Sequence, residues 1–288
     1  MTQACRTVWT EELVQKSKDE FARLQEIAPD LAKRAQVITD ESILEQKYRV
    51  RGAPLALIVN DVATLWPYKL VAFILEQAIK ANRLNLQTKT PITKLTSIRL
   101  NDGSPRQLVV TPRGQIVARH VILATNGYTS HLLLEFGDLI VPERGIMTAL
   151  LPPNQRSRLS TTHAFIGLND SSPNHPDYLY QRPLSGVPNP NGHIMFGGGR
   201  VAATLDNMGT ADDSILDEGS AAYLRREPLH LLVFDGETEG LKELKATHQW
   251  SGIWGTSRDK KPWVGPVPGR EGVWLAGGYS GEAPALLR

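Results

Sequence analysis

The sequence predicts a mixed α/β fold in which helix–strand segments are combined with a second, mainly antiparallel β domain. Apolar residues recur at three- and four-residue intervals near the start of the chain, as in amphipathic helices. Alternating runs separated by Asn-Asp-Gly and Pro-Arg-Gly turn signals follow between residues 90 and 125. After residue 141, prolines, serines and asparagines interrupt short strand candidates, which is typical of a β-rich domain.

Composition narrows the class of protein. The 288 residues are enough for about two domains. With 32 basic and 30 acidic side chains the formal charge is only +2, which gives no reason to expect nucleic acid or a membrane surface as a partner. Cys5 is the single cysteine, so no intrachain disulfide can form. The N-terminus lacks the pattern of a signal peptide and no apolar run approaches a membrane span, so we expect a soluble, cytoplasmic protein.

Two helices are predicted in the first third of the chain. Thr10 can cap the first, which has Glu11 and Glu12 in its first turn and is broken or restarted at Pro29. The second begins at Pro67 and runs to Ala81 with an apolar stripe. The alternation in LNLQT, residues 84–88, then predicts a strand.

Three β-like runs form a predicted meander: TPITKLTSIRL, RQLVVT and QIVARHVILAT. The last part, HVILAT, is nearly continuous in apolar residues and is expected to be buried on both faces, ending at Asn126-Gly127. In the second domain we predict strands at HAFIGL and YLYQR and a helix within residues 217–234, interrupted near Pro228. Two further strands are expected at THQWSGIWGTS and GVWLAGG.

The stretch GGGRVA, residues 197–202, matches the letters of the dinucleotide fingerprint G-x-G-x-x-G/A. A strand, GHIMF, precedes it, but no adequate helix or second strand follows, so a βαβ unit cannot be built. We therefore predict that the three glycines mark a bulged or closely approached strand end in the β-rich domain.

Three longer stretches carry a family resemblance. LWPYKLVAFILEQAIKANRLNLQTKTPITKL, VILATNGYTSHLLLEFGDLIVPERG and HQWSGIWGTSRDKKPWVGPVPGREGVWLAGGYSG resemble, in this order, the FAD-dependent oxidoreductases of the D-amino-acid oxidase superfamily, which includes glycine and sarcosine oxidases. The resemblance extends from about residue 60 to 281. It implies a discontinuous, doubly wound FAD-binding domain, only partly present here, with an inserted, mainly antiparallel β substrate domain.

On this resemblance, residues 1–59 would be a helical connector and the start of the substrate domain, and 60–130 the middle segment of the FAD-binding domain. Residues 131–248 would form the substrate domain and 249–288 the last segment of the FAD-binding domain. FAD is the implied cofactor. Ile92 is expected near the adenine of FAD. The turn expected against the diphosphate consists of Thr125, Asn126 and Gly127. The turn expected beside the flavin ring consists of Gly277, Gly278, Tyr279, Ser280 and Gly281. The alternatives are an ordinary strand-ending turn and a glycine-rich turn before a short tail.

The family chemistry implies hydride transfer from a carbon bearing an amine to the flavin, followed by reoxidation of the flavin by oxygen. An arginine is the natural clamp for a substrate carboxylate, because its planar fork binds both oxygens. Arg182, Arg200 and Arg258 are candidates, although each could be an ordinary surface or structural arginine. Lys260, and with it Lys261, could assist the reaction with oxygen or be a solvated loop lysine. Tyr178 and Tyr180 could line a substrate cavity or belong to the core.

Other features limit this interpretation. The seven histidines show no metal-ligand spacing, so no metal is expected. The nine residues before Thr10 cannot hold the N-terminal phosphate-binding βαβ unit of the family, and the tail after Gly281 departs from the family pattern. Unpaired strand edges, weak FAD binding and poor solubility are the expected results. The alternative function is therefore a catalytically inactive relative, either a binding or scaffold protein or a non-functional fragment.

Overall fold

The computed structural model describes the chain as two compact units. The described residues are 2–154, 158–170, 176–184, 192–236 and 238–280. The first unit consists of Met1–Thr64, Gly145–Leu205 and Ser214–Ser251, and the second of Leu65–Arg144, Asp206–Asp213 and Gly252–Arg288. The predicted mixed α/β class is confirmed. The assignment of flavin and substrate roles at boundaries 60, 130 and 248 stays a prediction.

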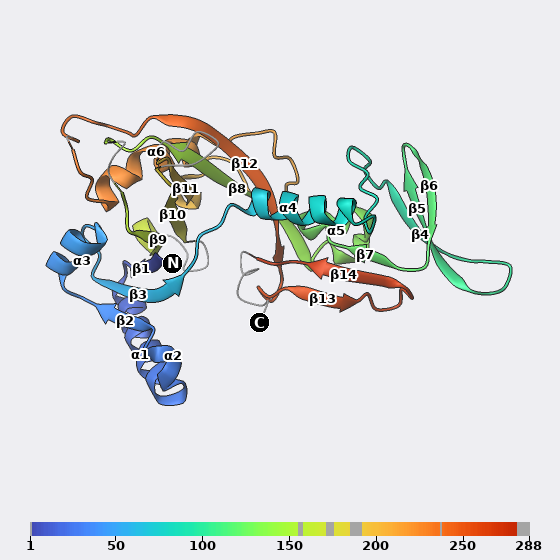
Figure 1. Ribbon diagram of the computed structural model, residues 1–288, viewed down its shortest axis with the longest axis horizontal. Coiled ribbons are helices and arrows are strands. Elements are labelled where there is room, and N and C mark those ends of the chain that lie inside the picture. The colour runs from blue at the N-terminus through green and yellow to red at the C-terminus, as the bar shows by residue number, and fades with distance from the viewer. Residues whose placement is uncertain (1, 155–157, 171–175, 185–191, 237, 281–288) are drawn as a thin grey trace. The chain divides into compact units, whose positions relative to one another are not determined.

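The first unit is built on a sheet with the strand order β12-β8-β11-β10-β9-β1-β3-β2 (Figure 1). Strands β1 and β9 are parallel, whereas β1–β3, β2–β3, β9–β10, β10–β11 and β8–β11 are antiparallel. Residues 140–144 of β8 and 252–257 of β12 belong to the second unit. The strand bounds are β1 Thr2–Val8, β2 Ala35–Ile38, β3 Leu55–Val62, β8 Ile140–Leu150, β9 Thr161–Ile166, β10 Asp177–Gln181, β11 Ile194–Gly198 and β12 Ala246–Ser257.

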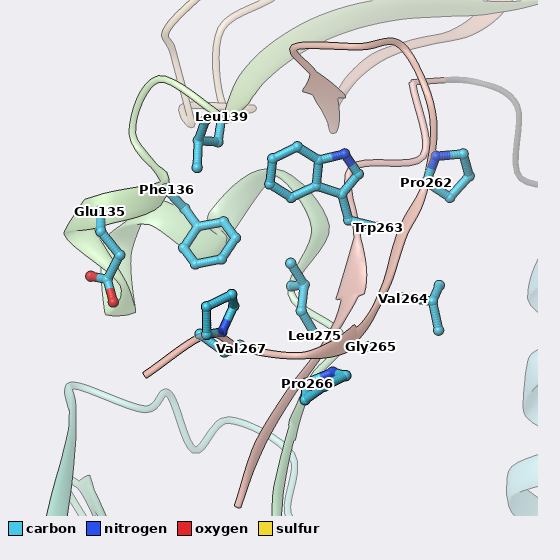
Figure 2. Close-up of a pocket in the computed structure, with 11 residues that line it drawn as sticks. Glu135, Phe136, Leu139, Pro262, Trp263, Val264, Gly265, Pro266, Val267 and Leu275 are labelled. Atoms are coloured by element: carbon cyan, nitrogen blue, oxygen red, sulfur yellow. The ribbon is translucent and has the colours of Figure 1, made fainter. Parts of the chain in front are cut away.

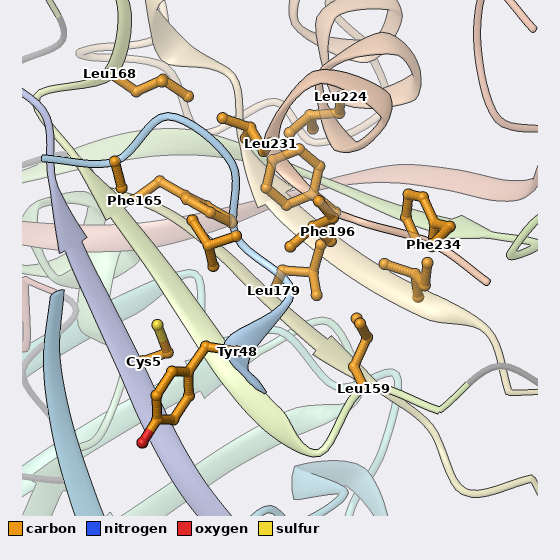
Figure 3. Packing of buried hydrophobic residues seen from close by; sticks show 14 of the residues in the cluster. Cys5, Tyr48, Leu159, Phe165, Leu168, Leu179, Phe196, Leu224, Leu231 and Phe234 are labelled. Atoms are coloured by element: carbon orange, nitrogen blue, oxygen red, sulfur yellow. The ribbon is translucent and has the colours of Figure 1, made fainter. Parts of the chain in front are cut away.

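One face of this sheet carries the hydrophobic core of the first unit. Helices α3 (Glu41–Tyr48) and α6 (Glu218–Leu231) contribute to the same cluster, as Figure 3 shows for Tyr48 and Leu224. Phe165 and Phe196 meet edge to face with their ring centroids 6.1 Å apart, and both are fully buried. We call this side the core face.

The opposite side of the sheet is less covered, and we call it the open face. Because successive side chains of a strand point to opposite sides, its members follow from the strand register. The paired open-face positions are Ala35, Val37, Leu55, Leu57, Val59, Ala4, Arg6, Val8, Thr162, Ala164, Ile166, Tyr178, Tyr180, Met195, Gly197, Met147 and Ala149. Helix α1 covers one end, where Leu13 and Val14 pack against Val8, Leu55 and Ile166.

The first predicted helix is confirmed, but two strands around it were missed. Helix α1 (Glu11–Ile27) is capped by Thr10, whose Oγ1 accepts from the Leu13 N–H at 3.3 Å, and α2 (Pro29–Ala32) restarts at the predicted proline. The chain nevertheless opens with β1 rather than with a helix, and β3 occupies a stretch for which no strand was predicted. Both strands lie inside the sheet, so long-range pairing decides their structure.

The second unit contains two small sheets and helix α4 (Pro67–Lys80), which begins at the predicted Pro67. The predicted meander is confirmed for β4 (Lys94–Arg99), β5 (Pro105–Thr111) and β6 (Gly114–Ala118). Residues 84–88 form no strand, so that prediction was wrong. The other sheet has the order β13-β14-β7, with bounds Trp263–Pro266, Val273–Gly277 and Val121–Leu123.

Strand β7 corrects a further expectation. It was predicted to be buried on both faces, but it lies at the edge of its sheet and Ile122 is 70% exposed. Only Leu123 of the strand is buried. The short helices η1 (Asn126–Tyr128), α5 (Thr129–Leu132) and η2 (Leu134–Phe136) follow it, while η3 (Leu168–Asp170) and η4 (Arg200–Ala202) belong to the first unit. Within the described parts of the chain, no helix is both long and apolar enough to cross a membrane.

Candidate functional site

Two of the predicted flavin segments meet in the second unit. Strands β7 and β14 are parallel neighbours, with Leu123 paired to Leu275, so their carboxyl ends lie side by side. The segment 125–127 follows the first strand and the segment 277–280 completes the second. Open α/β sheets bind ligands at the carboxyl ends of their parallel strands. The structure therefore places these residues together at a position suited to a ligand.

Asn126 joins the two segments. Its side-chain Oδ1 accepts hydrogen bonds from the backbone N–H groups of Gly278, at 3.0 Å, and Tyr279, at 3.3 Å. Asn126 itself has φ 44°, in the left-handed region that asparagine enters more readily than most residues. The residue type thus satisfies both the backbone conformation and the two donors. We call this arrangement the Asn126 junction.

The end of β12 completes the Asn126 junction. Ser280 N donates to the carbonyl of Gly255 at 2.9 Å, and Ser257 N donates to Ser280 Oγ at the same distance. Thr256 forms an isolated bridge with Tyr279. Three chain segments are therefore held together by hydrogen bonds made mostly by backbone atoms.

Close packing explains why glycine occupies two positions of the junction. A Cβ on Gly127 would overlap the carbonyl of Trp254, and one on Gly255 would lie 2.8 Å from Asn126 Oδ1. The N–H groups of Gly278, Tyr279 and Ser280 already donate to protein oxygens. These three N–H groups are therefore already satisfied within the protein and do not form a phosphate cradle. Gly281, also predicted here, lies outside the described residues.

Three other predicted residues of the second unit, Ile92, Arg258 and Lys260, make none of the hydrogen bonds of the Asn126 junction. Ile92 is half-buried and packs against the unit's apolar cluster. Arg258 and Lys260 are exposed in the turn between β12 and β13. That turn is held by Asp259, whose Oδ1 accepts from Lys261 N at 3.1 Å and Trp263 Nε1 at 3.0 Å. These hydrogen bonds hold the pKa of Asp259 below its usual value.

The second unit also contains a cavity that the sequence did not indicate. Its volume is about 580 Å³ and its lining is mainly apolar (Figure 2). Phe136 and Trp263 meet edge to face across it, with ring centroids 6.0 Å apart. Glu135 is the charged residue of the lining, and its carboxylate is paired with Arg270 at 2.7 Å. None of the predicted flavin residues lines this cavity.

The predicted substrate residues lie in the first unit. Tyr178 and Tyr180 belong to the open face, opposite Gly197 and Met195, while Leu179 between them is buried in the core. Tyr178 is 37% exposed and Tyr180 is half-buried, and neither belongs to the hydrophobic core cluster of the first unit. Arg182 N donates to the carbonyl of His193 at 2.8 Å, which continues the β10–β11 pairing beyond the strand ends.

The GGGR stretch is a strand end, as predicted. Strand β11 ends at Gly198, and Arg200 begins the short helix η4. The ring of Tyr178 lies over Gly197, where a Cβ would come within 2.7 Å of its Oη. Gly199 has φ +70°, which turns the chain toward Arg200. Arg200 is half-buried.

Asp177 holds this turn and was not predicted. Its Oδ1 accepts from Gly199 N and its Oδ2 from the Tyr223 hydroxyl, both at 2.7 Å. A Cβ on Gly198 would overlap the carboxylate. Burial raises the pKa of Asp177 to about 6, against the opposite effect of its two hydrogen bonds. The only sequence signal is an acidic residue directly before an alternating strand, which is too common to identify such a role.

In the described parts of the chain, no group of three or more His, Cys, Asp or Glu side chains could hold a metal ion. Each unit thus has its own candidate site: the Asn126 junction in the second unit and the tyrosine-bearing open face in the first.

Comparisons with known proteins agree on one family. The chain is 28% identical over 182 residues to the glycine oxidase of Pseudomonas aeruginosa, which covers 62% of this chain and 42% of that protein. Its fold matches the glycine oxidase of Geobacillus kaustophilus (TM-score 0.70, 20% identity) over 96% of this chain and 65% of that one. It also matches an L-proline dehydrogenase of P. horikoshii (TM-score 0.67, 17% identity) over 97% of this chain and 67% of that one.

The chain thus spans 42% of the first relative and about two thirds of the solved structures. The family model described as "DAO: FAD dependent oxidoreductase" matches residues 2–283, which is nearly the whole chain. This chain belongs to the DAO family of FAD-dependent oxidoreductases.

Proposed function

We propose that this chain forms part of an FAD-dependent oxidoreductase that oxidises an amine or amino acid at the carbon beside its nitrogen. The observation that carries the proposal is the Asn126 junction, which assembles predicted flavin contacts at the carboxyl ends of two parallel strands. Membership of the FAD-dependent family supports the cofactor. The names of the relatives, glycine oxidase and L-proline dehydrogenase, support an amino-acid substrate.

The residues of the second unit would bind the cofactor. Asn126 fixes the turn at residues 125–127 against the 277–280 segment, so that little rearrangement would be needed when a ligand binds. Thr125 Oγ1 lies 2.9 Å from Thr129 Oγ1, which ties the turn to α5. FAD would supply the acceptor for a hydride from the substrate carbon. We further propose that oxygen is consumed and that Lys260 or Arg258 lies near this chemistry.

The residues of the first unit would bind the substrate. Tyr178 and Tyr180 offer aromatic rings with hydroxyl groups on the half-covered open face, and burial raises the pKa of both, so the hydroxyls stay protonated and can donate hydrogen bonds. Arg182 follows them at the next position of the same alternation and could hold a carboxylate. Arg200, presented by the turn that Asp177 holds, is the second candidate for this role.

The experiment is a cofactor titration followed by a reduction. Purified protein is incubated with excess FAD, separated from free cofactor, and examined for the flavin absorbance near 450 nm. Glycine and L-proline are then added without oxygen, and loss of that absorbance reports oxidation of the substrate. Asn126→Ala should lower FAD retention, whereas Asn126→Asp, which keeps the acceptor oxygen, should lower it less.

A folded protein that stays colourless with excess FAD would contradict the proposal. It would favour the alternative of a catalytically inactive relative that binds or scaffolds other molecules. The exposed apolar side chains of α4 are the observation that favours this alternative, because large exposed apolar surfaces commonly mark interaction sites.

A further inference from the structure

Strand β13 has a free edge with almost no backbone donors. It is the outermost strand of its sheet, and the stretch 262–268 around it contains three prolines, at 262, 266 and 268, which have no N–H group. Val267 N donates to the carbonyl of Val273 at 2.9 Å. The alternation of an antiparallel pair then directs the N–H groups of residues 263 and 265 toward β14 as well. Within this described stretch, only the N–H group of Val264 points to the free edge.

The cavity of about 580 Å³ lies along this edge. Its lining includes every residue from 262 to 268, while Glu135, Phe136 and Leu139 line it from η2 and the turn that follows (Figure 2). A β-strand added here would find a single N–H donor, whereas a ladder needs donors and acceptors at regular intervals, and prolines at a sheet edge commonly prevent such pairing. The edge therefore disfavours an extended peptide, and the volume of the cavity is in the range that holds a small molecule.

The walls of the cavity offer mainly apolar and aromatic surface. Phe136, Val267 and Leu275 are buried and belong to the apolar cluster of the second unit. Trp263 donates its indole N–H to Asp259 Oδ1 at 3.0 Å, so the ring is held in place and its one polar atom is already satisfied. The edge-to-face rings of Phe136 and Trp263 present both an edge and a face against which a flat aromatic molecule can pack.

The charge at the cavity is balanced. Glu135 is the one ionisable side chain among the lining residues, all of which are described, and its Oε1 accepts from Arg270 Nε at 2.7 Å. This hydrogen bond holds the pKa of Glu135 below its usual value, so the carboxylate stays charged and paired near neutral pH. An anion would be repelled by the carboxylate and a cation by the guanidinium, so the lining favours a ligand without net charge.

We propose that the cavity between η2 and β13 is a binding site for an uncharged, flat aromatic molecule of about two rings. The rings of this ligand would pack against Phe136 and Trp263. The inference goes beyond the proposed function, because no residue expected to contact FAD or substrate lines the cavity. It also requires neither flavin nor oxidation.

The test compares two fluorescent probes that share their rings and differ in charge. N-phenyl-1-naphthylamine is neutral, and 8-anilino-1-naphthalenesulfonate adds a sulfonate to the same ring system. Each is titrated into the full chain, and the rise in fluorescence on leaving water reports binding. The neutral probe should bind at one site with a dissociation constant below about 100 µM, and at least about tenfold more tightly than the sulfonate. Equal affinities, or no saturable binding of the neutral probe, would overturn the inference.

Two tryptophans on neighbouring strands give a matched pair of variants. Trp263→Leu removes an aromatic wall and should weaken binding of N-phenyl-1-naphthylamine by about tenfold or more. Trp274→Leu is the control, because Trp274 is also a tryptophan of this sheet but does not line the cavity, and it should bind the probe like the wild type. Equal losses in the two variants, or no loss in Trp263→Leu, would refute the assignment.

A third variant tests the charge balance and keeps Trp263 intact. Glu135→Gln leaves Arg270 without its carboxylate, so the sulfonate probe should bind about threefold or more tightly than to the wild type, while the affinity of the neutral probe stays the same. An unchanged preference between the probes would contradict a balanced lining. Excess FAD should leave the neutral probe bound, and its displacement by FAD would overturn the inference by assigning the cavity to the cofactor.

Discussion

The two units differ in how completely they bury their apolar side chains. In the first, Tyr48, Phe165 and Phe196 are at most 1% exposed and belong to one core cluster formed by the sheet and its helices (Figure 3). In the second, helix α4 has no buried residue, and Phe73 and Ile74 on it are 59% and 55% exposed. The apolar stripe predicted for this helix is present, but it is not covered within the described chain. Amphipathic spacing thus shows that a helix has an apolar side without showing what covers it.

The comparison also separates two kinds of candidate site. The open face of the first unit belongs to a sheet whose other side is covered by a hydrophobic core, so a rigid sheet holds its side chains. The Asn126 junction of the second unit stands on a three-stranded sheet whose edge strand, β7, exposes Ile122. We expect perturbations of the first unit to cost more stability than equivalent perturbations of the second.

The largest expected effect is a core truncation. Phe196→Ala removes a fully buried ring and should lower the free energy of unfolding of the first unit by about 3–5 kcal/mol, measured by urea denaturation. The matched change in the second unit, Phe73→Ala on α4, should cost less than about 1 kcal/mol, because little burial is lost. Similar costs for the two variants would show that α4 is buried in solution and would remove the contrast between the units.

The second prediction concerns Asp177. Asp177→Ala leaves the Gly199 N–H and the Tyr223 hydroxyl without their acceptor and should cost about 2–4 kcal/mol in urea denaturation. Asp177→Asn keeps an oxygen for Gly199 and should cost less. If the alanine variant is as stable as the asparagine variant, Asp177 does not hold the turn.

The same residue predicts a pH dependence. Its folded pKa of about 6 lies above the ordinary value near 3.9, so folding favours the neutral acid. The resulting stability is fully present below about pH 4 and is lost as the pH rises through 6, with an upper limit of about 3 kcal/mol. The difference in unfolding free energy between wild type and Asp177→Asn should follow this trend between pH 4 and 7. A difference that does not change with pH would mean that the carboxyl titrates normally.

The Asn126 junction should respond more weakly. Asn126→Ala removes the acceptor of two N–H groups and should cost about 1–3 kcal/mol, whereas Asn126→Asp keeps the acceptor. Hydrogen exchange at the amides of Gly278 and Tyr279 reports the effect locally. Faster exchange in the alanine variant alone is the expected result, and unchanged exchange would mean that the side chain does not hold the segment.

The smallest effect on stability is expected on α4. Ile74→Lys places a charge among exposed apolar side chains and should change the unfolding free energy by less than about 0.5 kcal/mol. It should raise the concentration at which the protein begins to associate, as measured by light scattering, because the apolar patch is interrupted. Loss of folding in this variant would indicate that another part of the protein normally covers the helix.

Local sequence signals predicted the elements whose ends are marked by a helix cap, a proline or a turn. The cap at Thr10 and the proline at residue 67 gave helices α1 and α4, and the turns of the meander gave β4 to β6. Strand β1 was missed because its strand structure comes from pairing with β9, about 157 residues away, and not from its own alternation. The place of Arg6 on the open face could not be predicted for the same reason.

The family resemblance selected both segments of the Asn126 junction as FAD contacts, and that role stays a prediction. The hydrogen bond that joins Asn126 to Gly278 was not predicted, because it depends on the folded chain. Two features depend on distances that only the folded chain defines. One is the close contact of the glycines with other chain segments, and the other is the hydrogen bond from Gly199 N–H to Asp177. Burial of HVILAT was overestimated because apolar composition does not reveal a sheet edge.

The Asn126 junction also bears on how the chain folds during its synthesis. Asn126 and Gly278 are separated by 152 residues, so the turn leaves the ribosome well before the segment that it binds. At about 5–20 residues per second, translation of the intervening chain takes roughly 8–30 s. During that interval the turn has only its local contacts, and a chaperone that shields β7 and its flanking loop would act in this period.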